Sequence, residues 1–390
     1  MPPIVKNRIA SVDLLKGLVM VIMALDHVRD YYHYPAFFYD PTDPMHTSMP
    51  IFFTRWITHF CAPTFSLLAG LSAFFVGRRK SRAELSAFLI KRGVWLIFIE
   101  MVVATFAWYF DPGFHNVGLF VIWALGISMI VLAGLIHLPL KFILIISCLI
   151  IFGHNALDNI HIENNFLWAA LHDGGRFPIF GGRILEIGYP VIPWVAVMSL
   201  GYCLGPLYHA GFGDEKRRRF LVLAGVSAIA LFAALRFINV YGDPHDWTKL
   251  DTVRQKLIVF LNPLKYPPSL LYLLMTIGPG LIFLAVSESF KGRVVNFFST
   301  FGRVPFFYYV LHLYFIHVGA LVLAKLTGFG WSMWAMQDWV SFLPQLQGYG
   351  INLFFTYLVW ITIILLLYPL CKKFEAYKLG HKEKWWLSYL

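Results

Sequence analysis

Ten apolar runs, each long enough for an α-helix to cross a bilayer, dominate this chain of 390 residues. Backbone amide and carbonyl groups find no partners in lipid, so such runs can only be helices that bond internally. The sequence therefore predicts an all-α fold, a polytopic integral membrane helical bundle of ten or eleven transmembrane helices. The predicted spans cover residues 11–31, 52–77, 88–110, 118–136, 141–158, 188–209, 220–240, 268–287, 303–325 and 351–371.

The composition agrees with a membrane protein and excludes the usual soluble enzymes. Hydrophobic residues make up 58% of the chain and charged residues only 14%, whereas soluble domains carry about 25% charged residues. The formal net charge of +11 does not indicate nucleic-acid binding, because the basic residues form short clusters between apolar runs. That pattern is typical of membrane topology signals.

The orientation follows from Lys and Arg, which membrane proteins concentrate in cytoplasmic connections. The segments on the same side of the membrane as the N-terminus, which itself contains Lys6 and Arg8, carry 21 of the 32 Lys and Arg residues. The sequence therefore predicts that both termini are cytoplasmic. The first run lacks a small-x-small cleavage site, so we expect it to be retained as the first span. The long polar loops then face outward, at 32–51, 159–187, 241–267 and 326–350.

Two ionisable residues share one face of the first span, Lys16 and His27. Eleven residues at about 100° each come within about 20° of three full turns, and the helical rise separates the two by roughly 16 Å. Ionisable groups are costly in hydrocarbon, and they mark functional sites by default. Lys16, on the cytoplasmic side, could bind a phosphate; the alternatives are that it reaches back to the interface or pairs with Asp13.

Histidines on the outer side are the candidate catalytic bases. Asp26 precedes His27, and a carboxylate next to an imidazole can hold its tautomer and prepare it as a general base. A solvated and idle His–Asp pair is the alternative. His59, near Pro63 in the second span, is a second candidate that could equally be a satisfied core histidine. His46, in the first outer loop, is a third.

Other polar residues lie in the middle of apolar runs. Glu100, in the third span, needs a partner, and Arg92 or a histidine of another helix could supply one. His312 follows Tyr309 near the middle of the ninth span, so both are expected to line the bundle interior. No metal site is expected: the four cysteines show no CxxC spacing, and the cluster around Asp243 is interpreted as hydrated loop.

The opening segment resembles the first helix of transmembrane acyltransferases. Ser11-Val12-Asp13, Lys16-Gly17 and His27 carry this resemblance, and the spacing of a cation, ten residues and a histidine matches the acyltransferase-3 branch. The rest of the chain is more similar to heparan-α-glucosaminide N-acetyltransferase-like bacterial membrane proteins. The segments that carry this second likeness are 92–93, 123–126, 192–205, 265–280 and 302–312.

The resemblance implies that residues 1–390 form a single transmembrane acyltransferase domain in a bacterial inner membrane. Cytoplasmic acyl-CoA, above all acetyl-CoA, would be the donor, and a hydroxyl or amine of an extracytoplasmic carbohydrate or glycolipid the acceptor. Lys16, Arg92 and Arg303 are the expected contacts to CoA. The lysosomal heparan enzymes lack a histidine equivalent to His27 and have one further along the chain. His46 or His59 could take that role here, whereas the spacing from Lys16 supports His27, so the candidate catalytic histidines rank in the order His27, His59 and His46.

The alternative is a proton-coupled transporter or flippase in which Lys16, Glu100 and His312 form a polar pathway. Transporters often consist of repeated halves, and the absence of an internal repeat in the sequence favours an enzyme. The expected partners are membrane lipid, acyl-CoA and the glycan acceptor, with no nucleic acid. A homodimer is compatible with the sequence.

Overall fold

The computed structural model describes residues 9–209, 211–243 and 245–388, so the basic lead with Lys6 and Arg8 lies outside the described residues. The first half of the chain forms α1 (Ala10–Tyr32), α2 (Met49–Trp56), α3 (Cys61–Gly77), α4 (Arg82–Ile99), α5 (Thr105–Tyr109), α6 (Val121–Leu135), α7 (Leu140–Gly153) and α8 (Phe166–Trp168). The second half forms α9 (Ile192–Cys203), α10 (Asp214–Ile238), α11 (Val253–Leu261), α12 (Leu270–Val286), α13 (Arg293–Arg303), α14 (Pro305–Leu326) and α15 (Leu353–Gly380).

Each of the ten predicted spans coincides with a helical segment, and two of these segments are composite. A 3₁₀ turn at Ile57–Phe60 joins α2 to α3, and a π-helical turn at Glu100–Ala104 joins α4 to α5. Mid-helix turns of these kinds are often found at functional positions. Both of the predicted intramembrane residues His59 and Glu100 lie in such turns.

By length and composition, six helical segments within the described residues can cross a membrane. These are Met49–Gly77, Leu140–Leu157, Asp214–Ile238, Leu270–Ser289, Pro305–Leu326 and Leu353–Gly380. The apolar segments Val121–Leu135 and Ile192–Tyr208 are shorter, and charged residues such as Asp13, Lys16 and Asp26 interrupt α1. The protein is thus a helical integral membrane protein, whereas the predicted number of ten spans exceeds these six.

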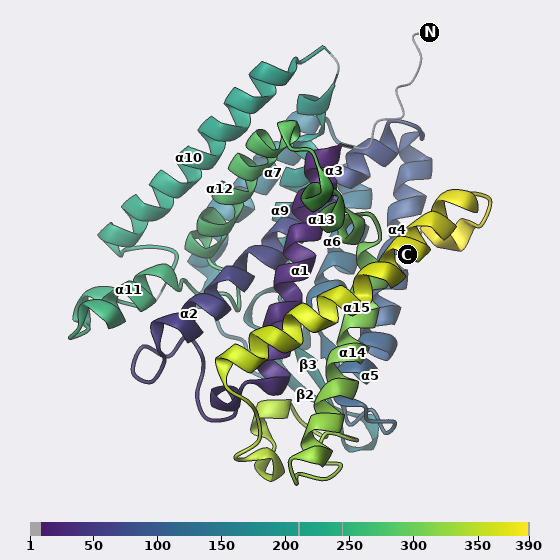
Figure 1. The fold of residues 1–390 in the computed structure, drawn as a ribbon. Coiled ribbons are helices and arrows are strands. Elements are labelled where there is room, and N and C mark those ends of the chain that lie inside the picture. The colour runs from purple at the N-terminus through teal and green to yellow at the C-terminus, as the bar shows by residue number, and fades with distance from the viewer. Residues whose placement is uncertain (1–8, 210, 244, 389–390) are drawn as a thin grey trace.

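Helix α1 runs through the centre of the bundle from one end to the other, with α15 crossing the outside diagonally and α10 at the edge (Figure 1). Most residues of α1 are buried, whereas few residues of α10 and α15 are buried and many of their apolar side chains are exposed. Exposed apolar side chains on long helices are the expected lipid-facing surface. The face of α1 with Lys16 and His27 therefore lies among protein side chains.

Pairs of glycines allow four pairs of helices to cross closely. Gly17 of α1 meets Gly302 of α13, and a Cβ atom added at Gly17 would lie 1.8 Å from the carbonyl oxygen of Phe298. Small residues permit such backbone approach in membrane helix packing. The same relationship joins α3 to α9, α4 to α6 and α10 to α12, through the pairs Gly70 and Gly201, Gly93 and Gly126, and Gly225 and Gly278.

A small sheet corrects the all-α prediction. Strands β1 (Asn116–Leu119), β2 (Gly175–Ile179) and β3 (Arg183–Ile187) form it in the order β1-β3-β2, with β1 parallel and β2 antiparallel to β3. The sheet lies at the end of the bundle where α1 terminates (Figure 1). Strands β2 and β3 lie in the predicted outer loop 159–187, whereas β1 overlaps the start of the predicted span 118–136. With four or five residues each, the strands are too short for a periodic apolar pattern.

Candidate functional site

The central feature of the site is a contact between two histidines of different helices. His27 of α1 and His312 of α14 lie with Nδ1 of His27 2.8 Å from Nε2 of His312. Their ring centres are 5.0 Å apart and their planes differ by 19°. Because the nitrogens are so much closer than the ring centres, the rings meet edge to edge, as a hydrogen bond between ring nitrogens requires.

The two histidines differ in accessibility. His27 is only partly buried, whereas His312 has no exposed surface. The indole of Trp108, from α5, meets the His27 ring edge-on with centres 4.7 Å apart. Nδ1 of His312 lies 3.1 Å from the backbone carbonyl oxygen of Tyr308, and the ring of Tyr309 packs against it. Of this pair, only His27 has exposed surface.

Asp26 has other partners than the imidazole next to it. Its carboxylate lies 3.0 Å from Nη2 of Arg29 and 3.2 Å from Nη1 of Arg55, and Arg29 also pairs with Asp30. These side chains are largely buried, so the two arginines offset the cost of removing the carboxylates from water. The hydrogen-bond partner of the His27 ring is therefore His312, from a helix far along the chain.

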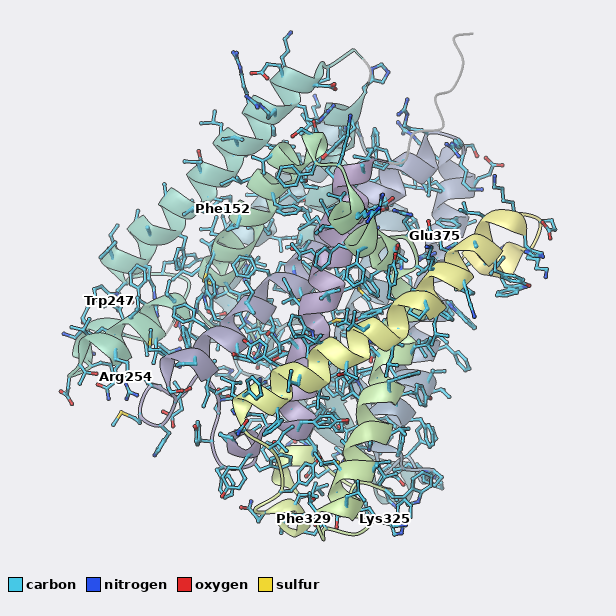
Figure 2. All side chains as sticks on the ribbon, in the orientation of Figure 1. Phe152, Trp247, Arg254, Lys325, Phe329 and Glu375 are labelled. Carbon is cyan, nitrogen blue, oxygen red and sulfur yellow. The ribbon has the colours of Figure 1, made fainter. Side chains whose placement is uncertain are left out.

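The three cations predicted to contact CoA each adjoin a glycine of a helix crossing. Lys16 precedes Gly17, Arg92 precedes Gly93, and Arg303 follows Gly302. Lys16 Nζ lies 3.4 Å from the hydroxyl of Ser72. Arg303 forms a 2.7 Å ion pair with Glu375 of α15, which Figure 2 labels.

Glu100 caps a helix. Its Oε2 atom accepts hydrogen bonds from the backbone amides of Ile122 and Trp123, at 2.6 and 3.0 Å. These amides belong to the first turn of α6, where backbone N–H groups lack intrahelical partners and the helix dipole favours negative charge. We expected a cation or a histidine as the partner of Glu100, but these two amides bind its Oε2 atom instead. Capping accounts for Oε2, whereas Oε1 is buried without a hydrogen-bond partner among the described residues.

His59 and His46 lie in contrasting surroundings. His59 is 1% exposed, its ring packs against Tyr272 and its backbone carbonyl accepts a hydrogen bond from the Tyr272 hydroxyl. Its Nδ1 has no hydrogen-bond partner among the described residues. His46 is exposed and lies 2.5 Å from Asp43, and this hydrogen bond lowers the pKa of Asp43. The contacts of His46 are within its own loop.

Aromatic and basic residues at or just before the starts of the sixth and eighth predicted spans meet, and their contact was not predicted from the sequence. The hydroxyls of Tyr189 and Tyr266 are 3.3 Å apart, and the ring of Tyr189 packs on that of Trp194. Lys265 Nζ lies 5.0 Å from the centre of the Tyr266 ring. Partial burial opposes ionisation of the Tyr266 phenol, yet the charges of Lys265 and Arg55 bring its pKa below the ordinary value. The sequence feature that could have indicated these residues is the aromatic content of segments 188–194 and 265–272.

No group of three or more metal-binding side chains occurs among the described residues. The interpretation of the Asp243 cluster as hydrated loop is wrong for Asp243 itself. Its carboxylate is fully buried and lies 3.6 Å from the guanidinium of Arg236. This ion pair ties the loop after α10 to that helix. Its hydrogen bond to His245 raises the pKa of that exposed histidine.

Fold and site together define a helical membrane protein with a histidine pair inside its bundle. Residues 8–237 match the family described as "Heparan-alpha-glucosaminide N-acetyltransferase, catalytic". This segment covers more than half of the chain, so the chain belongs to that family of acetyltransferases, as the sequence resemblance predicts. A comparison with curated proteins finds no match. The matched segment contains His27 and ends before His312.

Proposed function

We propose that the protein transfers an acyl group, in the first place acetyl, from cytoplasmic acyl-CoA to a hydroxyl or amine of an extracytoplasmic carbohydrate or glycolipid. The observation that carries the proposal is the position of His27. It is a partly accessible imidazole, hydrogen-bonded to a buried partner on α14, in a chain of an acetyltransferase family. We assign His27 as the general base, with His59 and then His46 as the lower-ranked candidates.

The reaction needs one proton acceptor at the acceptor substrate. His27 takes the proton from the hydroxyl or amine, whose electron pair forms a bond to the thioester carbonyl carbon. The carbon–sulfur bond then breaks, and the proton passes to the CoA sulfur to give the free thiol. Trp108 beside His27 limits the water that could compete with the acceptor.

Lys16 is assigned to the donor side. A lysine ammonium acts as a compact point charge for phosphate, and CoA carries several phosphate groups. Lys16 and His27 share one face of α1, roughly 16 Å apart along the axis. A bound acyl-CoA with its phosphates near Lys16 would extend its pantetheine arm along α1 toward His27. Arg92 and Arg303 are the further proposed contacts, although the ion pair with Glu375 gives Arg303 a structural role as well.

The acceptor is assigned to the end of the bundle that carries the sheet and the long polar loops. This assignment rests on the distribution of Lys and Arg, which predicts cytoplasmic termini, in a bacterial inner membrane. Tyr189 and Tyr266 offer aromatic faces and hydroxyls suited to a sugar. The transporter alternative needs Glu100 in a polar pathway, and its role as a cap on α6 favours the enzyme.

The proposal is tested with purified protein in lipid nanodiscs, radiolabelled acetyl-CoA, and either glucosamine or a glycolipid extract as acceptor. We expect labelled acetyl groups to appear on the acceptor in proportion to enzyme concentration. Free CoA and acetyl-CoA should each raise the unfolding temperature, whereas unrelated nucleotides should not. Absence of a thermal shift with every CoA ester would favour the transporter.

A further inference from the structure

We infer that His312 is a positioning residue that selects the reactive tautomer of His27 and leaves the lone pair of His27 on Nε2. The inference rests on the proposed function for its catalytic meaning. It concerns a residue that the sequence only predicts to line the bundle interior.

His312 is hydrogen-bonded to the backbone of its own helix, α14. Nδ1 of His312 lies 3.1 Å from the carbonyl oxygen of Tyr308. A carbonyl oxygen can only accept a hydrogen bond, so Nδ1 of His312 must carry a proton. His312 has no exposed surface, and its ring lies parallel to that of Tyr308 and meets that of Tyr309. In such surroundings the neutral imidazole is favoured, because burying a charge without a counter-ion is costly.

A second hydrogen bond joins His312 of α14 to His27 of α1. A neutral imidazole with its proton on Nδ1 has a lone pair on Nε2. Nε2 of His312 is 2.8 Å from Nδ1 of His27, so Nδ1 of His27 must donate the proton of this bond. The proton of neutral His27 is therefore on Nδ1, and its Nε2 is free to act as a base.

The arrangement does what a carboxylate does for the histidine of a catalytic triad, which is to hold the imidazole in one tautomer and one orientation. Here the final acceptor is a backbone carbonyl, relayed by a neutral imidazole, and no buried negative charge is needed. Asp26 does not orient the His27 ring, since its carboxylate forms ion pairs with Arg29 and Arg55. When His27 takes up a proton at Nε2, the bond from its Nδ1 to His312 is retained.

The inference is tested first without any substrate. The protein is labelled with ¹⁵N-histidine, and its spectrum in nanodiscs is compared with that of His27→Ala to assign the His27 nitrogens among those of 14 histidines. We expect a protonated Nδ1 and a bare Nε2 for His27, and a scalar coupling between its Nδ1 and Nε2 of His312. A proton on Nε2 of His27, with Nδ1 bare, would overturn the inference even if His27 were essential for activity.

The second test uses two substitutions of His312. In His312→Gln the amide oxygen can accept from His27 and the amide nitrogen can donate to Tyr308, so kcat should stay within about tenfold of wild type. In His312→Leu both functions are lost, and kcat should fall by about 10²- to 10⁴-fold while KM for acetyl-CoA is unchanged. Equal loss in both variants, at equal thermal stability, would contradict the positioning role.

A matched control separates positioning from packing. Tyr314, two residues further along α14, donates a 3.3 Å hydrogen bond to the carbonyl of Val103, and Tyr314→Phe removes a polar contact of the same helix without touching the pair. Its activity and its His27 spectrum should match wild type. If the wild-type spectrum shows the expected tautomer but His27→Ala transfers acetyl groups at the wild-type rate, the assignment of His27 as the base fails and the hydrogen-bond relay stands.

Discussion

The imidazoles of His27 and His312 lie 2.8 Å apart although 285 residues separate them in the chain. The contact joins the central helix α1 to α14, and it gives a catalytic candidate a buried partner that fixes its hydrogen bonding. Lys16 lies on the same helix about three turns away. The proposed reaction thus has its donor contact, its base and the support of that base on two helices of the bundle core.

Substitution of Lys16 tests the donor side. Lys16→Ala should raise the Kd for CoA about tenfold, which corresponds to about 1.4 kcal/mol of binding free energy. The stabilisation by CoA in thermal unfolding should shrink accordingly, because stabilisation by a ligand follows its affinity. Lys141→Ala serves as the control, since Lys141 contacts the ring of Phe142 at the start of α7. An undiminished CoA shift in Lys16→Ala would remove Lys16 from the site.

The crossing of α1 and α13 predicts a stability effect without a direct effect on chemistry. Gly17→Ala places a methyl group 1.8 Å from a backbone oxygen of α13, and overpacking of this kind costs typically about 1–3 kcal/mol. Gly134→Ala is the matched control, because an added Cβ there meets nothing within 4 Å. Thermal unfolding should show a clear decrease for the first and no decrease for the second. Equal stability of both would contradict the close crossing.

Glu100 separates the enzyme from the transporter. Glu100→Gln keeps a side-chain oxygen for the amides of Ile122 and Trp123, so acyl transfer and stability should remain near wild type. Glu100→Ala leaves two buried amides without an acceptor and should cost about 1–3 kcal/mol of stability for each unsatisfied group. A proton-coupled pathway requires an ionisable carboxylate, so loss of all activity in Glu100→Gln would contradict the capping role.

The alternative histidines are distinguished by their surroundings. His46 is exposed and hydrogen-bonded to Asp43, so His46→Ala should keep full activity and only weaken the lowering of the Asp43 pKa, to which the Met45 amide also contributes. His59 is buried against Tyr272, so His59→Ala should reduce stability and lower activity only in part. Activity assays with thermal unfolding of both variants check this order. Complete and selective loss of transfer in either would move the base away from His27.

The helices were largely predictable from the sequence. Apolar runs of about twenty residues indicate membrane-spanning helices, and each predicted span contains a helix. The glycines beside Lys16, Arg92 and Arg303 were visible as family-typical pairs, but their role in helix crossing appears only when two helices are placed together. Helix α13 was missed because its polar residues interrupt any apolar run.

The contacts of the site were less predictable, since they join distant segments. His27 and His312 were each singled out as costly polar residues, yet no local pattern pairs residues from the first and ninth predicted spans. Asp26 was expected to support His27 because it is adjacent, but adjacent helix residues point to different sides. The expected partner of Glu100 was Arg92 or a histidine, whereas Oε2 of Glu100 accepts from two backbone amides at the start of α6.

The most direct test of the account is acetyl transfer by His27→Ala, measured with radiolabelled acetyl-CoA beside wild type and with the unfolding temperature of both. We expect loss of transfer by at least about 10²-fold, with CoA-induced stabilisation retained and the unfolding temperature close to that of wild type. Transfer at the wild-type rate in a folded His27→Ala protein would contradict the assignment of His27 as the catalytic base.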